Sequence, residues 1–267
     1  MASSAAIEQR IVDAAAAGLD PAVDEPVSWC KPAESSGSWE TDSGSDEEES
    51  ADEDAELSLD VRAQLANAVV SLEAAPTGSD AAAMCQALGV HARDVRCRTA
   101  LCALRVFERA IVPAVAPLWN RSSDAPLRPP PVAAMRLARN LCAGEGGGQL
   151  AVRACGMLAQ CAGGLPAPRA LRDSECIAAA RALTQCLGNA VASNEDNQDC
   201  VWSLAFAAKS GWFRRALATG AGWCDDADLV NAVAMCIFSC VAADSDAARA
   251  RLGALVSDGE LVGRLVS

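Results

Sequence analysis

The chain has 267 residues, of which 51% are apolar, so it is long enough to bury a substantial core. Its formal net charge is −13, and ten carboxylates between Glu40 and Glu56, with no Lys or Arg among them, contribute −10 of that charge. The rest of the chain is nearly neutral. It therefore lacks the basic surface typical of nucleic-acid-binding proteins, and we expect no nucleic-acid partner.

The N-terminal stretch predicts little ordered structure. Residues 7–17 fit one short amphipathic helix, which Gly18 and Pro21 would end. Residues 20–55 are rich in Pro, Ser, Gly and acidic side chains and show almost no apolar periodicity, so they cannot bury enough surface to offset the entropy lost on ordering. We therefore predict that residues 1–56 form a mostly disordered acidic arm.

Three serines of this arm are predicted phosphorylation sites. Ser43, Ser45 and Ser50 each precede an acidic residue by three positions, a spacing that resembles the sites of acidophilic kinases. Phosphorylation would add roughly two negative charges at each site to an arm that already repels itself.

Beyond Leu57 apolar residues recur at helical spacing, and stretches rich in Gly and Pro separate the segments. The expected helices cover residues 57–72, 80–89, 93–108, 110–119, 132–143, 149–161, 174–191, 194–208, 228–242 and 245–255. No segment has the pattern of a strand, and no window approaches 18 uninterrupted apolar residues, so no membrane insertion is expected. The pattern predicts an all-α domain over residues 57–267.

Two stretches of this domain repeat one another. Asn140 and Gln149 are nine residues apart, Asn189 and Gln198 are also nine apart, and the two pairs are separated by 49 residues. This period fits stacked units of two or three helices, of armadillo or HEAT type, with an inserted loop. In the second copy we expect a helix N-terminus at Ser193 or Asn194, because such side chains cap helices and two acidic residues follow.

The residues of the second copy carry a family resemblance. The sequence LGNAVASNEDNQ at residues 187–198, followed by VW and AF, resembles the armadillo-type repeat of the ataxin-10 family, and LARNLC at residues 137–142 resembles its preceding repeat. The match is densest over residues 135–206, and the signature of the family's C-terminal domain is not found. The resemblance implies a right-handed armadillo/HEAT-like α-solenoid that acts as a non-catalytic protein-interaction scaffold. It also implies roles in cytokinesis, at the cilium or basal body, or in signalling assemblies, and a cytoplasmic location with perinuclear or basal-body association.

The same resemblance places Asn140 and Asn189 where armadillo proteins clamp the backbone of an extended partner. With the neighbouring polar residues they form a predicted partner-binding groove, made of Arg136, Arg139, Asn140, Gln185 and Asn189. Importin-like grooves carry Trp one turn before each Asn, and this chain has Arg136 and Gln185 there instead. This difference argues against a classical receptor for nuclear signals. A cargo adaptor resembling importin or β-catenin is therefore the alternative function rather than the leading one.

A structural interpretation of the two asparagines stays open beside the functional one. Each amide can instead bridge neighbouring repeats and satisfy buried backbone groups. We expect a structural role also for Gln149, Gln198 and Trp202, because a Gln at a helix start and a single Trp usually serve turns and packing.

The most basic stretch of the chain contains Arg93, Arg96, Arg98, Arg105 and Arg109, interspersed with two acidic residues. Such a stretch is usually a solvated helix face. The sharper hypothesis is that it receives an acidic segment, either from a partner or from residues 40–56 of this chain.

Enzymatic chemistry has little support in the sequence. Thirteen cysteines, mostly at apolar helical positions, indicate a reduced protein of the cytosol or nucleus that uses thiols as small core residues. With no C-x-x-C and with His91 as the only histidine, we expect no metal site and no cofactor. Motifs for phosphate, dinucleotide or acyl-transfer chemistry are also absent, so an enzyme of unrecognised class is the weakest alternative. Self-association through an exposed terminal repeat remains possible.

Overall fold

The computed structural model describes residues 57–119, 129–144, 147–163, 174–207 and 226–258. Within these ranges 83% of the residues are helical and no strand occurs, which confirms the all-α prediction. The predicted helix at residues 7–17, the predicted disorder of the arm and the three serine sites lie outside the described residues.

The α-helices are α2 (Leu59–Ala74), α3 (Ala81–His91), α4 (Val95–Ala103), α5 (Val112–Trp119), α6 (Pro129–Leu141), α7 (Gly147–Ala154), α8 (Met157–Gly163), α9 (Ser174–Val191), α10 (Glu195–Val201), α12 (Ala227–Val241) and α13 (Asp246–Ser257). Two π-helical segments, η1 (Phe107–Ile111) and η3 (Trp202–Ala207), continue into or from neighbouring α-helices. Side-chain oxygens cap five helix N-termini by accepting backbone N–H bonds, at Ser58, Asp94, Asn194, Asp226 and Ser245.

Two expected helices are interrupted in the structure. The segment predicted at residues 149–161 is divided into α7 and α8 at Gly156, whose φ is +75°. The segment predicted at residues 93–108 ends at Ala103, and Arg105 follows with a φ of 56°. A positive φ cannot continue a right-handed helix, and it is costly for a residue with a Cβ, so only the break at Gly156 has a signal in the sequence.

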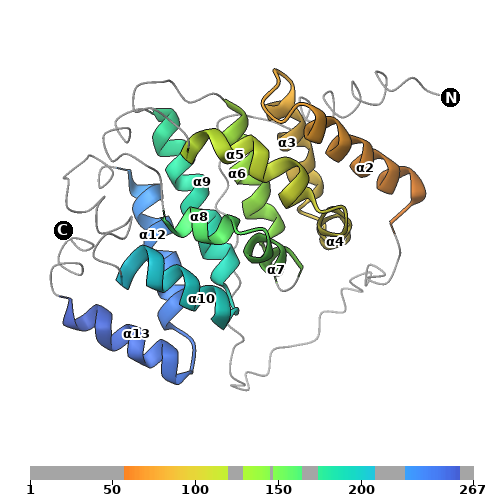
Figure 1. Ribbon diagram of the computed structural model, residues 1–267. Helices are drawn as coiled ribbons and strands as arrows, with labels where there is room; N and C mark the ends of the chain where they lie inside the picture. Colours follow the sequence, from red (N-terminus) through yellow and green to blue (C-terminus); the bar gives the residue numbers. More distant parts are fainter. Residues whose placement is uncertain (1–56, 120–128, 145–146, 164–173, 208–225, 259–267) are drawn as a thin grey trace, which may run out of the picture.

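The helices form an array that runs in chain order from α2 to α13, which lie at opposite ends of the molecule (Figure 1). One row consists of α3, α6, α9 and α12, and each of these helices packs against the next. From α4 onward, two shorter segments precede each long helix and pack against it or its neighbours: α4 and the continuous η1–α5 segment before α6, α7 and α8 before α9, and α10 and η3 before α12. From α4 the described chain is thus organised as successive units of two shorter segments and one long helix.

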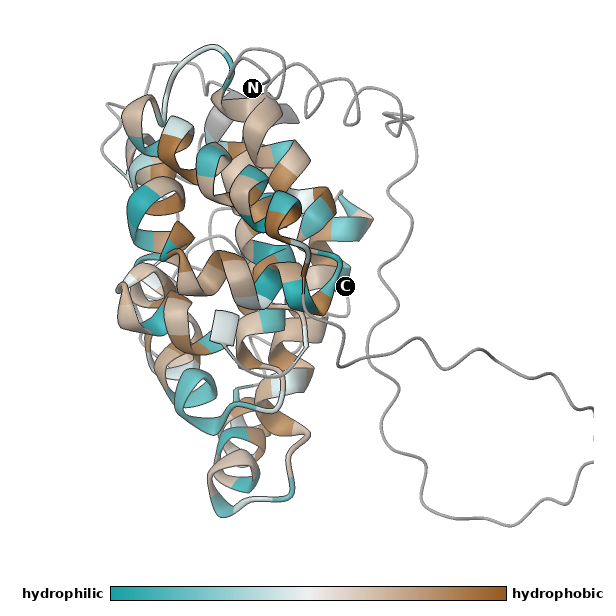
Figure 2. Cartoon of the chain, turned by 90° about the vertical axis from the view of Figure 1, so that its right-hand side faces the viewer, coloured by the Kyte–Doolittle hydropathy of each residue, from teal (hydrophilic) through white to brown (hydrophobic). Residues whose placement is uncertain are grey.

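A single apolar core runs through this array. Its largest fully buried side chains include Phe107 and Phe206, and it extends from Leu65 on α2 to Cys240 on α12. Apolar and hydrophilic residues alternate around single helices (Figure 2), as helices buried on one side require. No helix among the described residues is both long and apolar enough to cross a lipid bilayer.

Candidate functional site

The two repeated asparagines make the same contact at successive helix interfaces. The Asn140 Nδ2 on α6 donates a hydrogen bond of 2.8 Å to the Gly89 carbonyl on α3. The Asn189 Nδ2 on α9 donates a hydrogen bond of 2.8 Å to the Arg139 carbonyl on α6. Each amide therefore links a long helix to the preceding one, in the bridging geometry of the structural interpretation.

The other predicted groove residues lie around these two amides. Arg139 donates from Nη1 to the Gln185 Oε1 at 2.7 Å and from Nε to the Asn140 Oδ1 at 3.1 Å, so one guanidinium spans α6 and α9. Arg136 is exposed and makes no hydrogen bond or ion pair within the described part of the chain. The structure thus brings four of the five predicted residues together between α6 and α9, and Arg136 lies one helical turn before Asn140 on α6. We call this set, Arg136, Arg139, Asn140, Gln185 and Asn189, the polar seam.

Both repeated glutamines hold the turn that follows α9. Gln149 is only 4% exposed, and its Nε2 donates bonds of 2.9 Å to the carbonyls of Asn189 and Ala192, at the C-terminal end of α9. Gln198 is 2% exposed and donates 3.0 Å to the Val191 carbonyl in the same turn. Carbonyls at a helix C-terminus lack partners within the helix, so each Gln satisfies groups that would otherwise be buried without donors.

Residues between the repeated positions complete this turn. Asn194 accepts the Asn197 backbone N–H at 3.1 Å and is the cap of α10, one of the two positions predicted, and Ser193 before it has a φ of 54°. The Asn197 side chain is fully buried and its Nδ2 donates to the carbonyls of Ala190 and Gln149. Asn197 was not singled out from the sequence, although it sits beside Gln198 in the NQ pair of the repeat.

A close backbone approach explains the glycines of the first copy. A Cβ at Gly148 would lie 1.9 Å from the Leu141 carbonyl oxygen, so only glycine fits where α7 begins against the end of α6. The Gly-rich stretch therefore lets the chain fold back tightly between two helices of the core.

The last described interface uses different side chains. Arg181 on α9 pairs with Asp226 at 2.7 Å and with Asp228 at 3.2 Å, at the start of α12. Arg251 on α13, 4% exposed, donates to the Gln198 Oε1 at 3.0 Å and to the Cys240 carbonyl at 2.7 Å, and it pairs with Asp199. A guanidinium from the following helix thus holds the carbonyl at the end of α12. The asparagine and glutamine of the repeat have no counterpart at this described interface. The two arginines and three aspartates that form its ion pairs were not singled out from the sequence.

The predicted basic stretch is largely engaged within the chain. Arg96 pairs with Asp94 at 2.8 Å, Arg109 with Glu73 at 2.6 Å, and Arg105 with Glu108 at 3.5 Å. Arg98 donates to the carbonyls of Ala92 and Arg93 after the end of α3. Of the five arginines of this stretch, only Arg93 has a side chain without a hydrogen bond or ion pair among the described residues.

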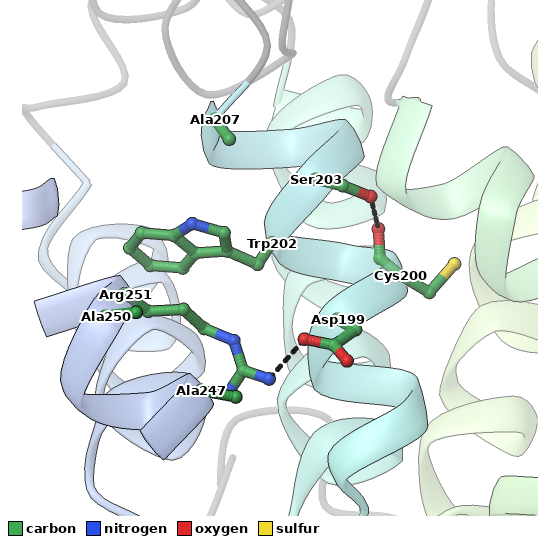
Figure 3. A pocket seen from close by; sticks show the side chains of 8 residues that line it. All are labelled: Asp199, Cys200, Trp202, Ser203, Ala207, Ala247, Ala250 and Arg251. Carbon is green, nitrogen blue, oxygen red and sulfur yellow. Dashed lines mark hydrogen bonds and ion pairs between the residues drawn. The ribbon is translucent and has the colours of Figure 1, made fainter. Parts of the chain in front are cut away.

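A cavity lies between η3 and α13 (Figure 3). It has a volume of about 670 Å³ and is lined mainly by Trp202, three alanines, Asp199 and Arg251. Trp202 projects from η3 toward α13, while Arg251 projects from α13 toward α10, where its guanidinium meets Asp199 (Figure 3). The Trp202 indole contacts the Phe206 ring, and the two ring centroids are 5.3 Å apart.

The described thiols are free, and most are buried. Burial raises the pKa of the Cys85 thiol to about 12, and the buried Cys142, Cys161 and Cys236 also have raised pKa values. A thiol with a raised pKa is a poor nucleophile at neutral pH. Within the described ranges, no three His, Cys, Asp or Glu side chains meet in a way that would hold a metal ion.

Comparisons with known proteins identify no relative of this chain. No family model, no curated protein and no solved structure matches it. Any function therefore has to be argued from the residues and contacts themselves.

Proposed function

We propose that the protein is a non-catalytic scaffold that binds other proteins, and that its three-segment units are armadillo-type repeats of a right-handed α-solenoid. The observation that carries the proposal is the repeated contact of Asn140 and Asn189, which join successive long helices in the same way. An array of equivalent units offers a long continuous surface for binding, whereas catalysis requires a closed constellation of reactive groups. The resemblance to the ataxin-10 family, carried by residues 135–206, supports the same class.

The polar seam is the surface that we assign to partner binding. Arg136 is exposed and uncommitted, and Arg139 and Gln185 are half-buried beside it. The Asn189 amide oxygen has no partner among the described residues, so it remains able to accept a backbone N–H from an extended segment. Both Asn Nδ2 atoms already serve the helix interfaces, so the arginines and Gln185 supply most of the partner contacts.

An affinity capture with substituted chains tests this assignment. We expect Arg136→Glu to lower the yield of specific partners at least five-fold, because it reverses the exposed charge of the seam. Its helical content should not change, since the Arg136 side chain is exposed and makes no hydrogen bond or ion pair among the described residues. Arg249→Glu is the matched control, because Arg249 is exposed on α13 and pairs only with the exposed Asp244 and Asp246. Equal capture by all three proteins would contradict the seam as the binding surface.

Cytoplasmic location and roles in cytokinesis, at the basal body or in signalling assemblies follow only from the resemblance and belong to the same proposal. Fluorescent tagging of the full chain in cells, with markers for basal body and cleavage furrow, tests them directly. A protein confined to another compartment would remove this part of the proposal while leaving the binding surface to its own test.

A further inference from the structure

An ion pair lines the cavity between η3 and α13, and its acidic member is exposed to solvent whereas its basic member is buried. The Arg251 side chain is 5% exposed, whereas the side chain of its partner Asp199 is 65% exposed. Arg251 Nη1 is committed to the Gln198 side chain and the Cys240 carbonyl, and Nη2 is committed to Asp199. An incoming group therefore meets the carboxylate of this pair rather than the guanidinium.

Other groups of the cavity also disfavour an anion. The Ser203 hydroxyl donates its proton to the Cys200 carbonyl at 3.0 Å, so this proton is not available to an anion. The remaining lining is the Cys200 side chain, the half-buried Trp202 indole and the methyl groups of Ala207, Ala247 and Ala250. An indole face attracts cations through its quadrupole, and its alkyl-lined surroundings suit the aliphatic stem of a long side chain.

The charges around the cavity point the same way. Glu195 and Asp196 lie in the first turn of α10, Asp246 lies in the first turn of α13, and Asp244 precedes α13 by two residues; Asp199 lines the cavity itself. Arg153, Arg249 and Arg251 form ion pairs with members of this set. Among these described residues the five carboxylates outnumber the three guanidinium groups, which favours a basic partner.

From this arrangement we infer that the cavity is a docking site for an arginine or lysine side chain in an extended segment of another protein. The aliphatic stem lies between Trp202 and the alanines, and the cationic head reaches the exposed oxygen of Asp199. The Trp202 indole N–H is a donor of the cavity and is suited to a backbone carbonyl of the same segment. The proposed site uses no residue of the polar seam and does not depend on the proposed function.

Fluorescence anisotropy with synthetic peptides tests the inference on the full chain. The probe is a labelled nine-residue Gly/Ser peptide with two arginines, compared with peptides that carry two leucines or two glutamates at the same positions. We expect the arginine peptide to bind at least five-fold more tightly than either, and its binding to weaken when the salt is raised from 50 to 300 mM. Equal binding of the three peptides, or no binding of the arginine peptide, would overturn the inference.

Substitutions locate the binding within the cavity. Asp199→Asn removes the charge but keeps an oxygen for Arg251, and Trp202→Leu removes the indole; each should weaken the arginine peptide about five-fold. Asp228→Asn is the matched control, since it removes an exposed carboxylate on α12 outside the cavity and should change binding less than two-fold. Circular dichroism identifies any variant that fails to fold, and Asp199→Asn keeps the test decisive if Trp202→Leu does. Unchanged binding by Asp199→Asn would overturn the assignment.

Discussion

The buried amide of Gln149 gives the sharpest test of how the units are joined. Replacing Gln149 by Met keeps the size and shape of the side chain but removes both Nε2 hydrogen bonds to the end of α9. The Ala192 carbonyl then loses its only donor in the described structure, and the Asn189 carbonyl keeps only a backbone bond of 3.4 Å. Two lost bonds to buried carbonyls should lower the free energy of unfolding by about 2–4 kcal/mol.

Urea unfolding followed by circular dichroism measures this loss. In thermal unfolding, the same loss of free energy corresponds to a fall in Tm of about 4–16 °C for a domain of this size. Gln160→Met on α8 is the matched control, because Gln160 is exposed and a change there should stay within about 0.5 kcal/mol. If Gln149→Met and Gln160→Met lower stability equally, the glutamine does not hold the turn and the reasoning is refuted.

Three further predictions concern packing, the buried guanidinium and the thiols. Gly148→Ala should lower the free energy of unfolding by about 3 kcal/mol, because its Cβ would meet the Leu141 carbonyl at 1.9 Å. Gly253→Ala on α13, where a Cβ meets no atom within 4 Å, should raise it by about 0.5–1 kcal/mol. An unchanged free energy of Gly148→Ala in urea unfolding would contradict this contact. Arg251→Met should cost about 2–4 kcal/mol by leaving the Cys240 carbonyl without its donor, and an unchanged urea midpoint would show that Arg251 does not hold α13. Burial raises the Cys85 pKa from 9.0 to about 12, so the unfolded chain loses this proton first and stability falls as the pH rises from 9 toward 12. Between pH 8 and pH 10 wild type should therefore lose about 1 kcal/mol more than Cys85→Ala, and equal losses would count against this burial.

Helix existence follows from the sequence because periodicity and breakers act locally. The prediction for residues 174–191 coincides with α9, and most other helices begin and end within about two or three residues of the predicted bounds, which is the usual uncertainty of such bounds. The break at Arg105 was missed because arginine is an ordinary helix-forming residue, and no local residue type announces a positive φ there.

The candidate site was only partly predictable. The 49-residue repeat singled out Asn140 and Asn189, and a period alone shows that two residues are equivalent without showing what they touch. Their partners, Gly89 and the Arg139 carbonyl, lie about 50 residues earlier and are backbone groups, which carry no signature in a sequence. Arg251 was missed for a related reason. It binds the carbonyl at the end of α12, at an interface where the residues of the repeat are not found.

Site-specific photo-crosslinking tests the binding surface most directly. A photoreactive amino acid placed at position 136 in the polar seam, in cells that express the full chain, should crosslink to a discrete set of proteins. The same group at Gln160, which is exposed on α8, should give none of these products. Identical crosslinked products from both positions, or products only from position 160, would contradict the proposal that this protein binds its partners along the seam.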